Sequence, residues 1–514
     1  MSTSNFEATA AFNWNDYRTI GAELKAAPYI KDETSEALPQ SMPGSQTLPG
    51  TLKLDSLDAK ATEFVWQFKD SLRYVQSRGT WLVWDQHVWK WDTTGKAQEL
   101  VKMFGRDFAR ASDFQSKEQI ENDRKWYRIL TSPKGINDIL TLAKTDPIMA
   151  ASPEQFDAGT LELNTPAGIV NLRTGKLTPP TSTKLVKRST SAAPDFSCAT
   201  PFYEHLLQDA FVGSPDLSSY FEAMMGVTLL KGQQEQVFMY MFGKAGSGKG
   251  TLMNIAKDIL GVGESGYAAY VDSAMFVSSR QSQHPTELMQ FLGARMVISS
   301  EITQGQKMDT GKLKRLTGGD SITGRYMGKD FVTFDPTHTL WLMANDRLQV
   351  PHDDQGVWRR LRVLPFDFAK KESEQVSGLY EKIMAEEAPG ILARWVEAAQ
   401  AYLESGMLTP DSVLAAREEY KQEQDTVAEW IESKADDTDP TFFTRGDALR
   451  DSYNNWCRSE RKTPLSTGKF GAALAEKGFT ATKKRIPVAP GMSQTTQHRG
   501  YFGLQLVDSA RIFS

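Results

Sequence analysis

The segment 236–260 limits the fold of this chain more than any other. An apolar run at 237–242 leads into the glycine-rich turn 243–251, and a helical pattern follows to Leu260, before Gly261. A strand, a glycine turn and a helix in this order are the setting of a P-loop, in which backbone N–H groups surround phosphate oxygens at a helix N-terminus. We therefore predict a nucleoside triphosphate site, with Lys249 on the β- and γ-phosphates. Its expected contacts are Gly243, Gly246, Ser247, Gly248, Lys249, Gly250, Thr251 and Leu252.

The residue after this lysine departs from the usual pattern. A Ser or Thr there normally holds Mg²⁺ through its hydroxyl. Here the position is Gly250, and the hydroxyl comes one residue later at Thr251. Gly-Lys-Gly-Thr also occurs in loops that resemble those of nucleoside monophosphate kinases. The loop alone therefore indicates a bound nucleotide and leaves the reaction open.

The composition is that of an ordinary globular protein. Its 514 residues are 40% hydrophobic and 24% charged, and the length suggests about three or four domains. Cys198 and Cys457 are too few for a disulfide framework or a zinc site, which favours a reducing compartment. We find no apolar run of membrane-spanning length and no secretory signal, so we expect a cytoplasmic protein, in a bacterial host cell, with no membrane partner.

Charge is distributed unevenly along the chain. The formal net charge is −5, yet residues 441–514 hold 12 Lys and Arg against 5 Asp and Glu, a charge of +7, which leaves −12 elsewhere. A basic C-terminal module on an acidic body suggests contact with nucleic acid, although a charged face is often only solvated.

The N-terminal third reads as an arm followed by an accessory domain. Residues 1–60 are polar and rich in turn formers. From 61 to 195 we expect an α+β domain, in which the segments 81–85 and 88–92 form two aromatic strands. Their four tryptophans could stack nucleobases, but packing within a small sheet is the favoured interpretation. No set of residues there suggests catalysis.

Two apolar strands after the glycine turn end in polar residues. The segment 294–301 ends at Glu301, as a Walker B strand does when its carboxylate faces Mg²⁺ and the attacking water. The segment 339–345 ends at Asn345, whose amide could hold that water. A solvent-facing glutamate and a turn-forming asparagine are the alternatives.

Basic residues follow these strands. The segment 312–334 reads as a helix end and a hairpin with its tip at 328–329, where cations could touch a phosphate backbone; a plain surface hairpin is nearly as well supported. Arg359 and Arg360 precede a short strand. Arginine binds phosphate bidentately and suits a finger that acts on a neighbouring subunit, with surface salt bridges as the alternative.

In this order the motifs resemble a known family. They are the glycine turn, the acid-ended strand, Lys-Arg-Leu-Thr-Gly-Gly-Asp at 314–320, the Asn-ended strand and Trp-Arg-Arg-Leu-Arg-Val-Leu-Pro-Phe at 358–366. The chain resembles superfamily III helicases of the phage/plasmid primase-helicase type, related to the poxvirus primase-helicase ATPase. The resemblance covers about residues 60–505 and is most specific at 243–366.

The resemblance implies an α/β AAA+-like P-loop ATPase core between an α+β N-terminal accessory domain and a C-terminal winged-helix-like domain. It implies ATP and Mg²⁺ as cofactors, and a homo-hexameric ring that moves 3′ to 5′ on single-stranded DNA. The expected domains are the arm 1–60, the accessory domain 61–195, the core 196–370, a helical lid or connector 371–435 and the basic domain 436–514.

The resemblance also implies roles for individual residues. Lys249, Glu301 and Asn345 match the phosphate-binding lysine, the Walker B acid and the sensor asparagine, and Arg360 or Arg359 is the arginine finger. Thr251 and Glu301 are the metal candidates. Gly250 and Ser300, where a second acid can stand, depart from the family pattern. The expected DNA contacts are Lys314, Arg325, Lys329, Lys483, Lys484 and Arg485, with Arg461 and Lys462 as further cations of the tail, which could bind duplex DNA.

These observations favour an ATP-dependent DNA helicase for replication of a phage, satellite, prophage or plasmid. We expect no primer synthesis, because the arm upstream of Ala61 has no spaced carboxylate pair with a histidine. A separate primase, initiator or loader could then be a partner. One alternative is a replication initiator that assembles on origin DNA without strong unwinding; another is a nucleotide kinase, which would leave Asn345 and the arginines unexplained.

Overall fold

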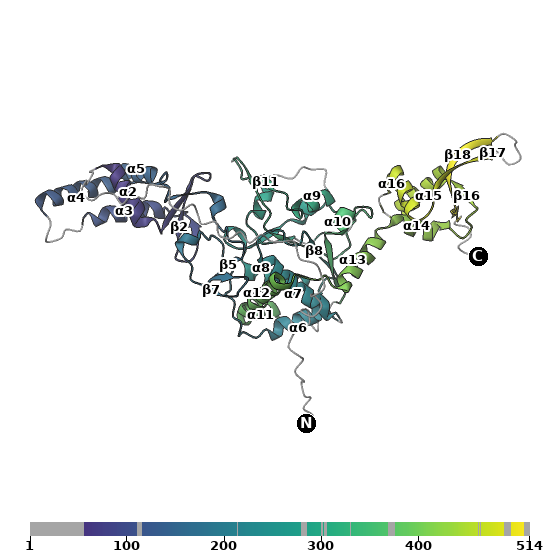
Figure 1. The fold of residues 1–514 in the computed structure, drawn as a ribbon, viewed down its shortest axis with the longest axis horizontal. Coiled ribbons are helices and arrows are strands. Elements are labelled where there is room, and N and C mark those ends of the chain that lie inside the picture. The colour runs from purple at the N-terminus through teal and green to yellow at the C-terminus, as the bar shows by residue number, and fades with distance from the viewer. Residues whose placement is uncertain are drawn as a thin grey trace, which may run out of the picture.

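The computed structural model has a mixed α/β fold whose parts lie in a row, with a central body between an N-terminal and a C-terminal part (Figure 1). The structure describes residues 56–109, 116–212, 214–278, 285–299, 302, 306–328, 330–368, 376–460, 462, 464–487 and 495–507. The predicted arm up to residue 55, Ser300, Glu301, Lys329 and Arg461 lie outside the described residues.

The N-terminal part is a helical cluster joined to a small sheet. Its helices are α2 (Leu57–Phe68), α3 (Lys96–Asp107), α4 (Lys117–Leu130) and α5 (Pro133–Ala143). Its strands are β1 (Leu72–Val75), β2 (Thr80–Trp84), β3 (Trp89–Trp91) and β4 (Ala150–Ala151), in the order β3-β2-β1-β4. Trp81 and Trp89 are buried, so these two rings pack within the sheet region as expected. The described part of this unit begins before the predicted boundary at residue 61, because α2 starts at Leu57.

The central body is built on a five-stranded parallel sheet. Its strands are β8 (Phe238–Gly243), β9 (Ala268–Val271), β10 (Met296–Ser299), β13 (Thr339–Ala344) and β14 (Leu361–Phe366), in the order β14-β8-β13-β10-β9. β10 is buried along its whole length and β8 and β13 are buried except at one residue each, as near-continuous apolar runs in a parallel sheet require. Helix α8 (Lys249–Leu260) is the next element after β8, across the glycine turn.

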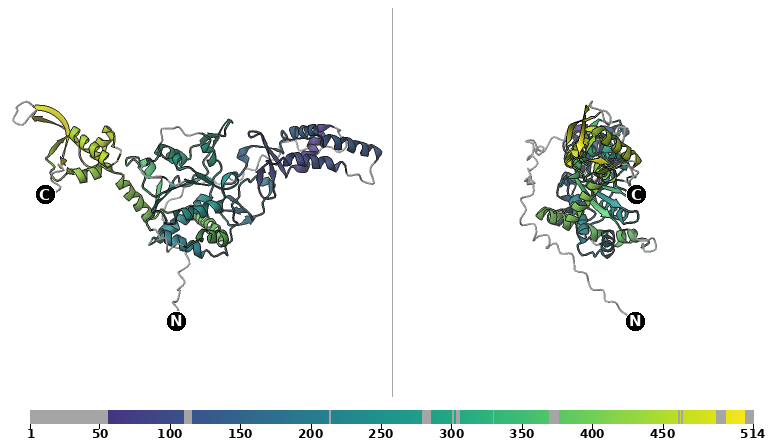
Figure 2. Two further views of the ribbon diagram at one scale, coloured as in Figure 1. Left: turned by 180° about the vertical axis from the view of Figure 1, so that it is seen from behind. Right: turned by 90° about the vertical axis from the view of Figure 1, so that its right-hand side faces the viewer.

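Further helices and short strands complete this body. They are β5 (Glu162–Thr165), β6 (Gly168–Asn171), β7 (Leu177–Thr178), α6 (Pro201–Ala210), α7 (Pro215–Leu229), α9 (Thr310–Leu316), β11 (Ile322–Arg325), β12 (Phe331–Phe334), α10 (Gln355–Trp358), α11 (Leu379–Glu386) and α12 (Ala388–Ser405). Helices α6, α7 and α12 share one core with α8 and with one face of the sheet. Figure 2 shows them below the sheet when the molecule is seen from behind.

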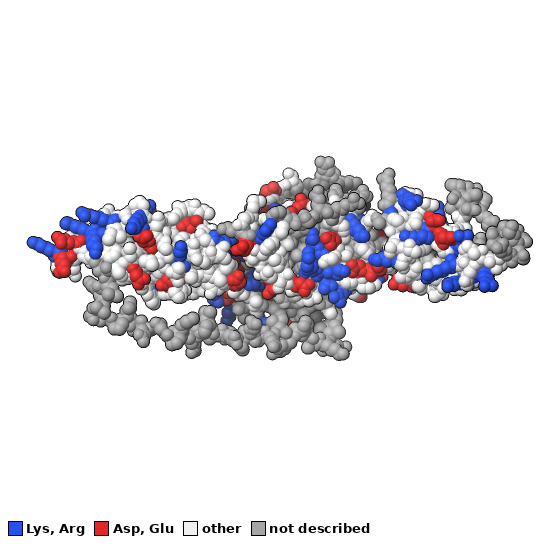
Figure 3. Space-filling model, turned by 90° about the horizontal axis from the view of Figure 1, so that it is seen from above, with Lys and Arg blue, Asp and Glu red and all other residues white. Residues whose placement is uncertain are grey.

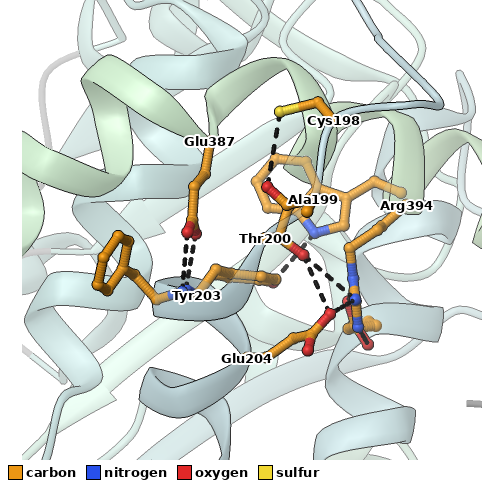
Figure 4. Close-up of polar contacts among 10 residues, drawn as sticks. Cys198, Ala199, Thr200, Tyr203, Glu204, Glu387 and Arg394 are labelled. Atoms are coloured by element: carbon orange, nitrogen blue, oxygen red, sulfur yellow. Dashed lines mark hydrogen bonds and ion pairs between the residues drawn. The ribbon is translucent and has the colours of Figure 1, made fainter. Parts of the chain in front are cut away.

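Charged side chains join α6, α7 and α12 (Figure 4). Arg394 of α12 binds both carboxylate oxygens of Glu222 on α7, at 2.7 and 2.8 Å, and reaches Glu204 of α6 at 2.6 Å. Glu387 accepts hydrogen bonds from the backbone N–H groups of Phe202 and Tyr203, both at 2.8 Å, at the first turn of α6. These contacts fix α12 to two helices that precede it by more than 150 residues in the sequence.

Helix α13 (Asp411–Glu423) leads to the C-terminal part. That part contains α14 (Thr426–Lys434), β15 (Ala435–Asp436), β16 (Phe443–Arg445), α15 (Gly446–Ser459), α16 (Thr467–Glu476), β17 (Ala481–Pro487), β18 (Thr495–Phe502) and β19 (Gln505–Leu506). Val427 and Trp430 of α14 are buried in one core with Tyr453 and Phe470. The packing therefore places α14 with the C-terminal part, ahead of the boundary expected at 436.

Among the helices that the structure describes, none is both long enough and apolar enough to cross a membrane.

Candidate nucleotide and nucleic-acid sites

The glycine turn lies between β8 and α8 at the carboxyl edge of the sheet. Gly243, Gly246 and Gly248 have positive φ angles of 148°, 77° and 89°. A Cβ on Gly243 would lie 2.1 Å from the carbonyl oxygen of Phe366, so this glycine also allows β8 to end directly beside β14. Left-handed backbone at these positions turns the loop tightly, and only glycine adopts it without strain.

Lys249 begins α8, and its ammonium group reaches back into the turn. Its Nζ atom donates to the carbonyl oxygens of Gly243 at 2.6 Å and Lys244 at 2.8 Å, and lies 3.2 Å from Ser247 Oγ. Lys249 and Ser247 are both buried, at 5% and 6% exposure. The turn therefore holds one ammonium group at the N-terminus of a helix, which is an arrangement that fits an anionic phosphate.

The neighbourhood of Gly250 is open. It lies in the first turn of α8, and a Cβ built there would meet no atom of the described residues within 4 Å, apart from its chain neighbours and the backbone of its own helix. Thr251 is partly buried at the next position of the same turn. The residues present fit a triphosphate group, and the glycine turn and the first turn of α8 carry the hydroxyls of Ser247 and Thr251.

Strand β10 ends at the same edge of the sheet. Its last residue, Ser299, is fully buried, and its Oγ atom accepts a hydrogen bond from Met343 N at 3.2 Å. The next described residue is Ile302, whose N–H donates to Met343 O at 3.1 Å. Glu301 lies outside the described residues, so its predicted role stays a prediction.

Asn345 directly follows β13, beside the start of the glycine turn. Ala344 pairs with Phe242 across the two parallel strands, so Asn345 and Gly243 come next at neighbouring positions. Its side-chain Oδ1 atom is buried and has no hydrogen-bond partner within the described part of the chain. A buried amide oxygen without a partner is costly, and at functional sites such groups are kept for a ligand or water.

Arg359 and Arg360 lie at the opposite edge of the sheet. They precede β14, and Arg360 O accepts a hydrogen bond from Phe238 N, at the first residue of β8. β14 then runs six residues to Phe366 beside Gly243, about 20 Å at the usual rise of a strand. Arg359 is exposed and Arg360 partly buried, so neither arginine reaches the glycine turn of its own chain.

Lys314 belongs to this second edge. Its Nζ atom lies 3.0 Å from Asp354 Oδ2 and 3.1 Å from Asp354 Oδ1. Burial alone would raise the pKa of the Asp354 carboxyl, but the hydrogen bonds from Lys314, Thr310 and the Val357 N–H, together with the charge of Lys314, outweigh it, and the pKa lies below its usual value. Sequence reasoning missed Asp354 as the partner, since the two residues are 40 positions apart.

The hairpin of β11 and β12 carries Arg325 and an exposed tip. Arg325 lies over the ring of Phe331 at 5.0 Å, and Met327 is 83% exposed. At this tip the ring of Tyr326 lies 4.2 Å from the guanidinium of Arg78, a residue of the N-terminal part. Arg78 also forms an ion pair at 3.0 Å with Glu264, which closely follows α8.

Lys187 and Trp91 complete this junction between the N-terminal part and the central body. Trp91 Nε1 donates to Glu264 Oε2 at 2.8 Å, and Lys187 lies 4.6 Å from the Trp91 ring. Burial lowers the pKa of Lys187 to about 8. The hairpin tip is thus in contact with the accessory part in this conformation.

The structure brings together only part of the predicted residue set. The glycine turn, Lys249, Thr251 and Asn345 lie at one edge of the sheet, and Arg359, Arg360 and Lys314 lie at the other. Lys483, Lys484 and Arg485 lie on β17, in the C-terminal part. Within the described residues, no group of three or more His, Cys, Asp and Glu has the arrangement of a metal site.

The central body thus has a parallel sheet with a glycine turn and a buried lysine at one edge, and comparisons with known proteins agree with the resemblance seen in the motifs. The family model described as D5 N terminal like matches residues 61–212. A family of unknown function (DUF5906) matches residues 241–360, which include the glycine turn and the arginines.

Curated relatives come from large viruses and a virophage, and their helicase names are provisional. Helicase L207/L206 of Acanthamoeba polyphaga mimivirus is 26% identical over 269 residues, which are 48% of this chain and 27% of the relative. Helicase V13 of Sputnik virophage is 30% identical over 126 residues, 22% of this chain and 16% of the relative. Helicase 184R of Invertebrate iridescent virus 6 is 32% identical over 85 residues, which are 16% of this chain and 9% of the relative.

These matches show that the chain resembles the D5-type primase-helicases. The chain spans about a quarter or less of the length of the curated relatives that it matches. A solved structure, the apo A form of the NrS-1 C-terminal region, aligns with 86% of this chain and 98% of its own, at 10% identity and a TM-score of 0.47.

Proposed function

We propose that the protein is an ATP-dependent DNA helicase that serves replication of a phage, satellite, prophage or plasmid. One observation carries the proposal: Lys249 and Asn345 lie at the same edge of the sheet. Lys249 comes after β8 and the glycine turn, and Asn345 comes directly after β13, the parallel neighbour of β8. In P-loop NTPases, a lysine on the phosphates and a polar side chain that orients water have this relation.

The strand order supports an AAA+-like core within this proposal. The strand that precedes the glycine turn lies between β14 and β13, and β10 lies beyond β13. In this proposal Glu301, after β10, is the Walker B acid. ATP is then held by the glycine turn, and Mg²⁺ by Thr251, Glu301 and the phosphates. The helicase names of the relatives favour the same class of function.

A ring assembly is the second part of the proposal. Arg359 and Arg360 lie about a strand's length, roughly 20 Å, from the glycine turn of their own chain. An arginine finger there would complete the site of the next subunit in a homo-hexamer. Lys314, Arg325 and Lys329 would then contact single-stranded DNA in the ring, and the motor would move 3′ to 5′.

The C-terminal part is the proposed winged-helix-like domain. Its elements follow in the order α14, β16, α15, α16, β17, β18, and its sheet has the order β16-β18-β17. This order supports a helix-turn-helix with a flanking β-ribbon, a scaffold that contacts DNA in many proteins. Its cations would bind duplex DNA next to the motor.

Replacement of the phosphate-binding lysine tests the ATPase. Lys249→Ala should lower ATP hydrolysis to background, because the triphosphate loses its main cation, while the melting temperature changes little. Lys257→Ala, about two turns further along the same helix, where the side chain is partly exposed, is the matched control and should keep wild-type hydrolysis. A Lys249→Ala variant that hydrolyses ATP normally would show that the site is elsewhere.

A second function is favoured by the basic C-terminal part and by Gly250, which removes the usual metal hydroxyl. A replication initiator would use ATP mainly to assemble on DNA. Unwinding of a forked substrate separates the two functions. Strand displacement that requires ATP and Lys249 supports the helicase, whereas ATP-dependent assembly on duplex without displacement supports the initiator.

A further inference from the structure

Two strands of the C-terminal part form a ribbon that extends away from the helices. β17 pairs with β18 over seven residues, from Ala481 opposite Tyr501 to Pro487 opposite Thr495. Tyr501, at its base, is buried in the core of the C-terminal part. Figure 1 shows the ribbon, in yellow, projecting beyond α14, α15 and α16. Its outer length therefore contributes little to the core.

The ribbon is cationic and has no carboxylate. Between Glu476 and Asp508 the sequence has no Asp or Glu, but has the five cations Lys477, Lys483, Lys484, Arg485 and Arg499. The four that lie on β17 and β18 are exposed. Lys and Arg side chains reach the surface at this end of the molecule (Figure 3). The DNA contacts predicted from the sequence include the three cations of β17 but not Arg499, although the segment without Asp or Glu is visible in the sequence.

Cations lie on both faces of the ribbon. Successive residues of a strand point to opposite faces, and Lys483 stands directly opposite Arg499, with Arg485 two residues further on the same face. Lys484 is opposite His498 on the other face, where its Nζ atom lies 5.1 Å from the ring of Phe502. Like charges directly opposite each other destabilise a sheet, so a polyanion that neutralises them would be bound favourably.

Helix α16, which would be the DNA-reading helix of a winged-helix domain, offers far fewer available cations than the ribbon. Its cation Lys469 pairs with Asp353 of the central body at 2.8 Å, and Lys477, at its end, pairs with Asp425. Phe470 and Leu474 are buried in the core. Its other exposed residues are Thr467, Gly468, Ala472, Ala475 and Glu476, which add a carboxylate and no cation.

We propose that the C-terminal part grips duplex DNA through the β17–β18 ribbon, with Lys483, Arg485 and Arg499 on one face and Lys484 on the other, and not through helix α16. A two-stranded ribbon fits the major groove of B-DNA, and cations on both of its faces reach the phosphates on both sides of a groove. This inference rests on the proposed function in DNA replication, which it deepens by naming the element that contacts the duplex.

The test is binding of the full chain to a short fluorescent duplex, measured by anisotropy over a range of salt concentrations without ATP. The double variant Lys483→Gln, Arg499→Gln should bind about tenfold more weakly at 0.15 M salt, and the slope of log K against log salt should fall by about 2, because each phosphate contact contributes about 0.9. Its melting temperature should equal or exceed that of the wild type, since the variant removes a like-charge pair.

Lys469→Gln and Glu476→Gln, both on α16, are the matched controls. Neither should lower the affinity for duplex or the salt slope. The inference is overturned if Lys469→Gln weakens binding as much as the ribbon variant, if the ribbon variant binds duplex like the wild type, or if it loses only single-strand binding. A wild-type chain that neither binds DNA nor hydrolyses ATP would instead overturn the proposed function.

Discussion

Two glycines of the glycine turn and the helix start after it differ in whether packing requires a glycine at their position. Gly243 is required by the close approach of β14, where any Cβ would meet Phe366 O. Gly250 has no such constraint within the part of the chain that the structure describes, because a Cβ there would meet no neighbouring side chain or backbone atom within 4 Å. The absence of a hydroxyl at position 250 is therefore not imposed by packing.

This difference gives a prediction for metal binding. Thr251→Ala should lower ATP hydrolysis by about tenfold or more if its hydroxyl has the role of the usual Ser or Thr on Mg²⁺. Gly250→Ser should keep the activity and the melting temperature, because the site is open. The measurement is the ATPase rate as a function of Mg²⁺ concentration.

The comparison of the two variants decides the matter. A fully active Thr251→Ala variant would mean that the phosphates and other groups hold the metal. An inactive Gly250→Ser variant would mean that a side chain at this position obstructs the nucleotide.

Helices form the next scale, and α12 is the one that joins the central body together. It packs on α7 and α6 through a buried charged contact, in which Glu222 is 4% exposed and bound by Arg394. Buried charges of this kind depend on their partners, because an ion left alone in a low-dielectric interior is strongly disfavoured.

Removal of Arg394 alone should therefore lower the stability of the fold far more than removal of both Arg394 and Glu222. Arg394→Met leaves the Glu222 carboxylate buried without its cation and should lower the free energy of unfolding by about 3–5 kcal/mol. The double variant Arg394→Met, Glu222→Met should recover most of the loss. Thermal unfolding of the three proteins gives the comparison, and equal destabilisation by the single and double variants would contradict it.

At the scale of the whole molecule, the two edges of the sheet motivate the proposed action of the arginines on a second subunit. The nucleotide residues and the arginines are at opposite ends of β8 and β14, and the accessory part contacts the hairpin tip through Arg78 and Tyr326. A monomer would leave Arg359 and Arg360 with no phosphate to bind.

Mixed oligomers can show whether the arginine acts between subunits. Lys249→Ala and Arg360→Ala should each be nearly inactive alone, the second by about 10³-fold if Arg360 is the finger. Mixed in equal amounts with single-stranded DNA, they should regain ATPase activity, because some interfaces combine an intact Lys249 with an intact Arg360. No recovery, in particles whose mass shows that they are mixed, would contradict action between subunits; Arg359→Ala is the control for the choice of arginine.

The sequence was sufficient for features whose cause is local. Apolar runs predicted β8, β10 and β13, since buried parallel strands need such runs, and the mixed α/β class is confirmed. The glycines at 243, 246 and 248 predicted a turn before α8, and the structure gives all three a positive φ. The helix starts one turn earlier than its apolar pattern, at Lys249, because the first turn of a helix needs no apolar residues.

Helix ends were less predictable. Proline and glycine usually interrupt helices, yet α5 starts at Pro133 and contains Gly135. Proline is favourable in the first helical turn, where its missing N–H has no partner in any case, and Ser132 caps the helix through Gly135 N. The break lies just before, at residues 131–132.

Only the tertiary structure decided which motifs meet. That Asn345 lies beside Gly243 follows from the pairing of β13 with β8, and that the arginines lie far from Lys249 follows from β14 running parallel to β8. The ion pair between Lys469 and Asp353, which lie in different parts of the chain, was likewise visible only in the tertiary structure. Spacing along a chain records local backbone preference, whereas strand order and ion pairing depend on contacts between distant segments, which no local pattern contains.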